Sequence, residues 1–104
     1  MQLHFTPLAE SDLIRVLDHV AKHRPQTALA VVNLIQEKCG LLALHPELGQ
    51  LRPELSHGVR SFSVKRWVIY YRIEDHRLTI VRVLDGAQDA HSQLGADAIS
   101  PDPE

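Results

Sequence analysis

The chain has 104 residues, of which 44% are hydrophobic and 23% charged, which fits one globular domain and leaves little room for two. No apolar run approaches the roughly 20 residues that span a bilayer, and the N-terminus lacks a basic and apolar leader. We therefore expect a cytoplasmic protein without a membrane partner. The net charge of −2 argues against a general nucleic-acid binder, which would present a basic face.

The first half of the chain predicts a short strand followed by two helices. Residues 2–6 alternate in polarity, as a strand does. Thr6 and Pro7 are a typical helix start, because the threonine oxygen can accept free N–H groups and proline at the first position loses no hydrogen bond. Apolar residues then recur every three or four positions through residues 7–23 and 25–45. So short a break between two helices predicts an antiparallel hairpin.

The second half of the chain predicts a sheet. A loop rich in proline and glycine precedes three strand candidates, at residues 59–65, 67–74 and 77–84. Links this short make antiparallel neighbours. The order of elements indicates an α+β domain over residues 1–94, with the helical hairpin packed on one face of a small, mainly antiparallel sheet and a short C-terminal helix or tail. Residues 95–104 are small, acidic and proline-containing, so we expect them to be disordered.

Charge is distributed unevenly along the chain. Residues 51–82 carry seven basic and three acidic side chains, whereas residues 83–104 carry five acids and neither Lys nor Arg. The predicted sheet is therefore basic and the C-terminal end is acidic. A locally basic sheet can attract an acidic peptide segment or a phosphate backbone.

No local pattern specifies an enzyme, a cofactor or a metal. The sequence contains no phosphate-cradling glycine loop, no nucleophile elbow and no pair of carboxylates at acid–base spacing. His19 and His23 stand four apart on one helix face, a spacing that can hold zinc. Both also flank a helix end, where the helix dipole and solvent favour imidazole, and we prefer this second interpretation. The single cysteine, Cys39, is expected to be a small buried hydrophobe in the second helix.

The arginines of the strands need partners. By strict alternation Arg82 shares a strand face with Leu78 and Leu84. An arginine in such an apolar row is costly to bury alone, so it should find a carboxylate or reach solvent. Asp85 and Glu54 are candidate partners within the chain.

Four stretches of the sequence carry a family resemblance. They are "AESDLIRVLDHV", "HPELGQLRPEL", "GVRSFSVKRWVIYYRI" and "VRVLDGAQD", and in this order they cover residues 3–94. The chain thereby resembles ParE, the toxin of a type II toxin–antitoxin pair and a member of the RelE/ParE superfamily of plasmid stabilisation proteins. The resemblance implies the fold above and either of two activities. RelE-like members cut messenger RNA in the ribosome, and ParE-like members poison DNA gyrase.

The residues at the family's catalytic positions separate these activities. The ribonucleases stabilise charge on the scissile phosphate with arginines, and at the matching positions this chain has Val68 and Gln88. Their C-terminal tyrosine has no counterpart in residues 87–104, and only Arg60 falls where they keep a basic residue. The resemblance therefore implies a toxin without catalysis of its own that binds DNA gyrase and is neutralised by a ParD-like antitoxin. The chain departs from ParE in "RVLDGAQD", where "RVLHGRRD" is commoner, so this loop lacks two basic residues.

The residues expected to contact antitoxin or target are Arg52, Arg60, Lys65, Arg66, Trp67 and Arg82. For each arginine a structural role competes with a binding role, and Trp67 is expected to be a core anchor rather than an exposed aromatic. We expect no sequence-specific nucleic-acid binding. Two alternatives stay open. One is a ribosome-dependent endoribonuclease that uses Arg60 with His91 as acid or base, and the other is a degenerate, non-toxic family member.

Overall fold

The computed structural model describes residues 1–88 and 90–94, so the expectation of a disordered tail at residues 95–104 lies outside the described residues. The elements in chain order are β1 (Gln2–Phe5), α1 (Pro7–His23), the 3-10 turn η1 (Pro25–Thr27), α2 (Ala28–Leu44), the 3-10 turn η2 (Pro46–Leu48), β2 (Gln50–Leu51), β3 (Arg60–Val64), β4 (Trp67–Glu74), β5 (Arg77–Asp85) and α3 (Ala90–Gln93).

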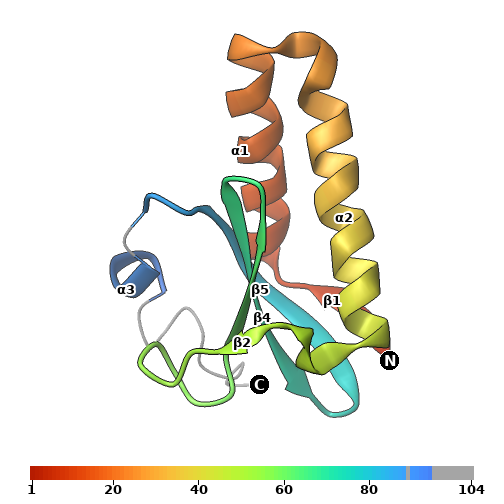
Figure 1. Cartoon of the computed structure of the whole chain (residues 1–104), viewed down its shortest axis with the longest axis vertical. Coiled ribbons are helices and arrows are strands. Elements are labelled where there is room, and N and C mark those ends of the chain that lie inside the picture. Colours follow the sequence, from red (N-terminus) through yellow and green to blue (C-terminus); the bar gives the residue numbers. More distant parts are fainter. Residues whose placement is uncertain (89, 95–104) are drawn as a thin grey trace.

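The five strands form one sheet in the order β1-β5-β4-β3-β2. β1 runs parallel to β5, and the remaining neighbours are antiparallel. The hairpin of α1 and α2 stands against one face of the sheet and reaches past the turn between β3 and β4 (Figure 1). The predicted α+β architecture, including the short C-terminal helix, is confirmed. The sequence missed β2, because a strand of two residues inside a proline-rich loop has no periodicity.

The start of α1 follows the predicted chemistry. Thr6 Oγ1 accepts a hydrogen bond from the N–H of Ala9 at 3.0 Å, and Pro7 is the first helical residue. The same hydroxyl donates to the carbonyl oxygen of Val81 at 2.9 Å. Thr6 therefore both caps α1 and attaches the start of this helix to β5.

Apolar side chains pack on both faces of the sheet. On the face that the hairpin covers, the largest fully buried side chains include Ile35, Leu42 and Tyr71. A smaller cluster on the opposite face lies beneath α3 and the loop after β2, and it is formed by Val59, Tyr70, Val81, Leu84 and Leu94. Cys39 is fully buried in the first core, and burial raises the pKa of its thiol to about 12. The predicted role of Cys39 as a buried hydrophobe is confirmed.

A β-bulge in β5 breaks the alternation expected from the sequence. Tyr70 pairs with Arg82 and Tyr71 pairs with Ile80, so Val81 is an extra residue. Leu78 consequently packs in the core under the hairpin, whereas Leu84 packs in the cluster on the opposite face. The prediction that Arg82 shares a face with both leucines is wrong, because a period of two does not survive an inserted residue.

The segment Pro25–Leu44 is long and apolar enough to cross a membrane by length and composition alone, which the sequence expectation overlooked. Its composition has a structural reason in this fold. Ile35, Cys39 and Leu42 of α2 are fully buried against the sheet, and the neighbouring Val31 and Val32 pack against the same core.

Candidate functional site

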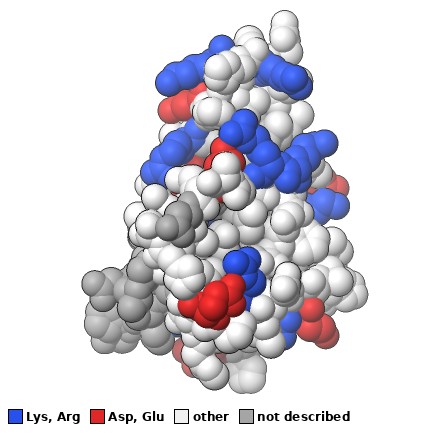
Figure 2. Space-filling view, turned by 60° about the vertical axis from the view of Figure 1, so that its left-hand side comes forward, with Lys and Arg blue, Asp and Glu red and all other residues white. Residues whose placement is uncertain are grey.

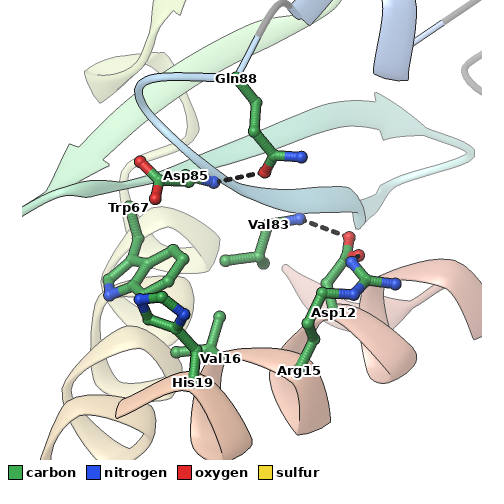
Figure 3. Close-up of a pocket in the computed structure, with 8 residues that line it drawn as sticks. All are labelled: Asp12, Arg15, Val16, His19, Trp67, Val83, Asp85 and Gln88. Atoms are coloured by element: carbon green, nitrogen blue, oxygen red, sulfur yellow. Dashed lines mark hydrogen bonds and ion pairs between the residues drawn. The ribbon is translucent and has the colours of Figure 1, made fainter. Parts of the chain in front are cut away.

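A buried carboxylate closes the open edge of β5. β1 pairs with β5 only as far as Ile80, so among residues 1–88 and 90–94 no strand pairs with this edge of β5 beyond that residue. Asp12 of α1, which is fully buried, takes that place: its Oδ2 accepts from the N–H of Val83 at 2.9 Å, as Figure 3 shows. Asp12 also accepts from Arg82 Nε and Nη2 at 2.8 and 3.0 Å and from Arg15 Nη1 at 2.7 Å. One carboxylate thus joins α1 to β5.

Arg82 is a structural residue in this arrangement. Only 6% of it is exposed, and its Nη1 donates to the carbonyl oxygen of Gln93 at 3.0 Å, which ties α3 to the sheet. The sequence missed Asp12 as its partner, since the two residues are 70 positions apart. The carboxylates expected for this role pair elsewhere: Asp85 with Arg66 and Glu54 with Arg52. We therefore remove Arg82 from the residues expected to contact a partner.

Arg60 secures the loop before β2. Its Nη1 donates to the carbonyl oxygen of Gly49 at 2.7 Å. The hydroxyl of Tyr71 accepts from the N–H of Gly49 at 2.8 Å and donates to the carbonyl oxygen of Pro46 at 2.6 Å. A Cβ at Gly49 would stand 2.4 Å from the Tyr71 oxygen, so only glycine fits there. Arg60 and Tyr71 together hold this backbone against the sheet.

Arg52 lies on the face of the sheet opposite to the hairpin. Its Nε donates to Glu54 at 2.5 Å, and its Nη1 donates to Ser61 Oγ at 3.2 Å. This contact with Arg52 holds the pKa of Glu54 below its ordinary value. Tyr70, whose pKa burial raises, lies beside the pair.

The residues expected for a ribonuclease do not meet. Arg60 pairs across the strands with Tyr71, which packs in the core under the hairpin. His91 belongs to α3. Leu94, the residue that follows α3, packs on the face of the sheet opposite to the hairpin. Gln88, at one of the lost arginine positions, uses its side-chain oxygen to accept from the N–H of Asp85. Arg60 and His91 are therefore separated by the sheet.

A groove of about 450 Å³ opens between the tip of the helical hairpin and the turn that joins β3 to β4. We call it the hairpin groove. It is lined by His19, Val20, His23, Arg24, Thr27, Val31, Lys65, Arg66 and Trp67. The first six residues come from the helices and η1, and the last three come from the strand turn.

The floor of the hairpin groove is apolar and aromatic. Trp67 is 7% exposed and belongs to the core, which confirms its predicted role as an anchor. The His19 ring meets the Trp67 ring edge-on at 5.8 Å between centroids, and the His23 ring lies 5.3 Å from that of His19. Arg66 lies over the Trp67 ring at 5.1 Å from its centroid and forms an ion pair with Asp85. Both His19 and Arg66 thus pack against the aromatic floor.

The rim of the hairpin groove is basic. Arg24 at the end of α1 and Lys65 in the strand turn are exposed, and neither forms an ion pair with any residue in the described part of the chain. Figure 2 shows Lys and Arg side chains gathered on the half of the molecule that holds the hairpin. Lys65 has a left-handed backbone conformation with φ of 57°, which fixes the turn beside the groove.

A smaller hollow of about 210 Å³ adjoins this groove and shares His19 and Trp67 with it (Figure 3). Asp12 and Arg15 line its other end. Within residues 1–88 and 90–94, no three His, Cys, Asp or Glu side chains gather in a way that would hold a metal ion.

Comparison with known proteins decides the family. Residues 3–90 match the model of the ParE toxin of the type II toxin–antitoxin system parDE. The chain belongs to the ParE toxin family. It is 38% identical over 85 residues to Toxin ParE3 of Caulobacter vibrioides, an alignment that covers 81% of this chain and 85% of that protein.

Solved structures of related systems share the fold. A chain of the chromosomal ParDE toxin–antitoxin system from P. aeruginosa matches with a TM-score of 0.73 and 27% identity over 82% of this chain and 95% of that chain. The toxin–antitoxin complex RelBE2 from Mycobacterium tuberculosis matches with a TM-score of 0.55 and 31% identity over 81% and 95%. The resemblance to the RelE/ParE superfamily is therefore confirmed.

In this ParE-family chain, three of the six residues expected to contact a partner meet at the hairpin groove: Lys65, Arg66 and Trp67. Arg52 and Arg60 lie at the β2 end of the sheet instead. Sequence reasoning missed the helical wall of the groove. The signal for it was the basic and histidine-rich end of the first helix, which we interpreted as a helix terminus in solvent.

Proposed function

We propose that this chain is the toxin of a type II toxin–antitoxin system, that it inhibits DNA gyrase by binding, and that a ParD-like antitoxin neutralises it. The observation that carries the proposal is membership of the ParE toxin family over residues 3–90. The relative in Caulobacter vibrioides is named a toxin, and the two related structures come from toxin–antitoxin systems. The place of action is the cytoplasm, where gyrase works.

Three features support inhibition by binding rather than by catalysis. Val68 and Gln88 stand where the ribonucleases of the superfamily keep arginines, so two phosphate-binding groups are missing. Arg60 donates to backbone carbonyls of the loop before β2. Arg60 pairs with Tyr71 on the hairpin side of the sheet, whereas His91 belongs to α3 on the opposite side, an arrangement that does not favour their joint action on one phosphate.

A supercoiling assay tests the proposal. Purified chain added to gyrase and relaxed plasmid should reduce supercoiling in a dose-dependent way, and the product of the neighbouring open reading frame should restore it. Unchanged supercoiling together with normal growth of bacteria that express the chain alone would instead identify a degenerate, non-toxic member.

The likeness to the RelBE2 complex makes ribonuclease activity the second candidate function. A translation extract distinguishes it, since discrete cleavage of messenger RNA that is lost in His91→Ala would assign the chain to the ribonucleases and reject inhibition by docking.

A further inference from the structure

We propose that the free toxin binds the phosphate backbone of duplex DNA, without sequence preference, through the cations at the tip of the helical hairpin and in the turn that joins β3 to β4. We call these cations the basic tip, and they are Lys22, Arg24, Lys65 and Arg66. The inference rests on the proposed function, because the DNA in question is the duplex that gyrase holds, and it adds a ligand and a surface.

Positive charge is concentrated at this end of the molecule. Residues 15–24 and 65–66 contain five Lys or Arg side chains and one acid, whereas residues 83–104 contain five acids and neither Lys nor Arg. Figure 2 shows the Lys and Arg side chains gathered on the half of the molecule that holds the hairpin. The net charge of −2 averages over both regions. A local excess of positive charge attracts a polyanion even where the whole chain is slightly acidic.

The cations of the basic tip are accessible. All four side chains belong to exposed residues. Lys22, Arg24 and Lys65 form no ion pair with any residue in the described part of the chain. Arg66 pairs with Asp85, yet its side chain is 55% exposed. A cation without a carboxylate partner can neutralise a phosphate and release the counterion bound there, which is the main source of non-specific affinity for DNA.

Two elements bring these cations to one surface. The hairpin reaches past the turn between β3 and β4, so both lie at the same end of the molecule (Figure 1). Arg24 from the end of α1 and Lys65 from the strand turn line the same groove. Lys22 stands three positions after His19, which also lines that groove, so the two share a helix face. Cations from separate elements can therefore contact several phosphates at once.

The extent of the patch favours a long polyanion. Lys22 carries the positive charge beyond the hairpin groove, whose nine lining residues include no Asp or Glu. A duplex repeats its negative charge along its whole length, so it can contact cations inside and outside the groove together. Contacts with phosphates position a protein on DNA without reading its bases. The proposal thus agrees with the expectation that the chain has no sequence-specific nucleic-acid binding.

Fluorescence anisotropy with a labelled duplex of arbitrary sequence tests the proposal on the full-length chain. We expect binding at low salt, with the logarithm of the association constant falling linearly against the logarithm of salt concentration. The slope should be about −2 to −4, as for roughly two to four phosphate contacts.

A matched pair of charge reversals locates the surface. Lys65→Glu should weaken DNA binding at least about tenfold. Lys38→Glu makes the same change in net charge on α2, at a position that does not line the groove, and should weaken binding less than about threefold. Arg24→Glu repeats the test on the opposite wall, and thermal unfolding checks that each variant keeps the fold. In the supercoiling assay Lys65→Glu should need a higher concentration than Lys38→Glu to inhibit gyrase.

Three outcomes would overturn the inference. A wild-type chain that inhibits gyrase but does not bind duplex DNA at low salt would reject it and leave the proposed function intact. Equal DNA affinity of Lys65→Glu and Lys38→Glu would place the DNA elsewhere on the chain. Loss of affinity for an acidic protein partner in Lys65→Glu, with DNA binding unchanged, would assign these cations to that partner. A wild-type chain that neither binds DNA nor inhibits gyrase would reject the proposed function as well.

Discussion

The open edge of β5 and the hairpin groove are neighbouring parts of one molecule, and both have α1 as a wall, yet their cations serve different ends. At the edge, Arg82 is buried and its guanidinium is bonded to Asp12 and to the end of α3. At the groove, Arg24 and Lys65 are exposed beside an apolar floor. An arginine that joins elements distant in sequence stabilises the fold, whereas a cation beside exposed apolar surface is available to a partner.

The largest expected effect comes from breaking the edge network. Asp12→Ala leaves the buried Arg82 unpaired and the N–H of Val83 without an acceptor, so the free energy of unfolding should fall by about 3–5 kcal/mol. Urea denaturation of variant and wild type measures it.

Arg15→Ala is the matched control for this variant. The Arg15 side chain bonds to the same carboxylate but is 62% exposed, and its loss should cost less than about 1 kcal/mol. An Asp12→Ala variant as stable as Arg15→Ala would show that the network contributes little.

The second effect extends the comparison to another polar group that spans two elements. Tyr71→Phe removes the hydroxyl that accepts from the buried N–H of Gly49, and we expect a loss of about 1–3 kcal/mol in unfolding free energy. Hydrogen exchange at Gly49 should accelerate in parallel. Unchanged exchange at that amide would mean that Arg60 alone holds the loop.

The third prediction separates stability from binding at the groove. Lys65 has φ of 57°, so Lys65→Gly relieves backbone strain and should raise stability by about 1 kcal/mol while it weakens DNA binding. His76, in the turn between β4 and β5, has φ of 60° and does not line the groove. His76→Gly should therefore stabilise the chain by a similar amount and leave the affinity unchanged. If both glycine variants bind DNA like the wild type, the charge of Lys65 has no part in recognition.

The smallest effect concerns the pH dependence of the ion pair between Arg66 and Asp85. The N–H of Ala87 and then Arg66 hold the pKa of Asp85 below its ordinary value of about 4. A depressed carboxyl pKa stabilises the fold fully above that ordinary value, and the contribution disappears as the pH falls through the lower, folded-state pKa. Asp85→Asn should thus flatten the acid limb of the stability profile. An unaltered profile below pH 4 would show that other carboxylates account for it.

Much of the fold was accessible from the sequence because it depends on local patterns. The threonine–proline start of α1, the hairpin and the strands from β3 to β5 follow from caps, periodicity and short turns. Non-local features were not accessible. The bulge at Val81 changes which face Arg82 occupies, and Asp12 becomes its partner only when α1 packs along β5. Cationic residues of the sheet were therefore taken together, although folding buries one and exposes another.

The hairpin groove, too, could be predicted only in part from the sequence. Lys65, Arg66 and Trp67 are adjacent in sequence and belong to the six residues expected to contact antitoxin or target. The opposite wall, with His23 and Arg24, joins them only through the tertiary contact between the hairpin tip and the strand turn. Sequence alone therefore found one wall of the groove, three of its nine lining residues.

The structure of the chain bound to gyrase and duplex DNA tests the central distinction most directly. We predict phosphate oxygens of the DNA within about 4 Å of both Arg24 and Lys65, and Arg82 still paired with Asp12. A basic tip without phosphate contacts, with the DNA held instead by Arg52 and Arg60 at the β2 end, would contradict the account.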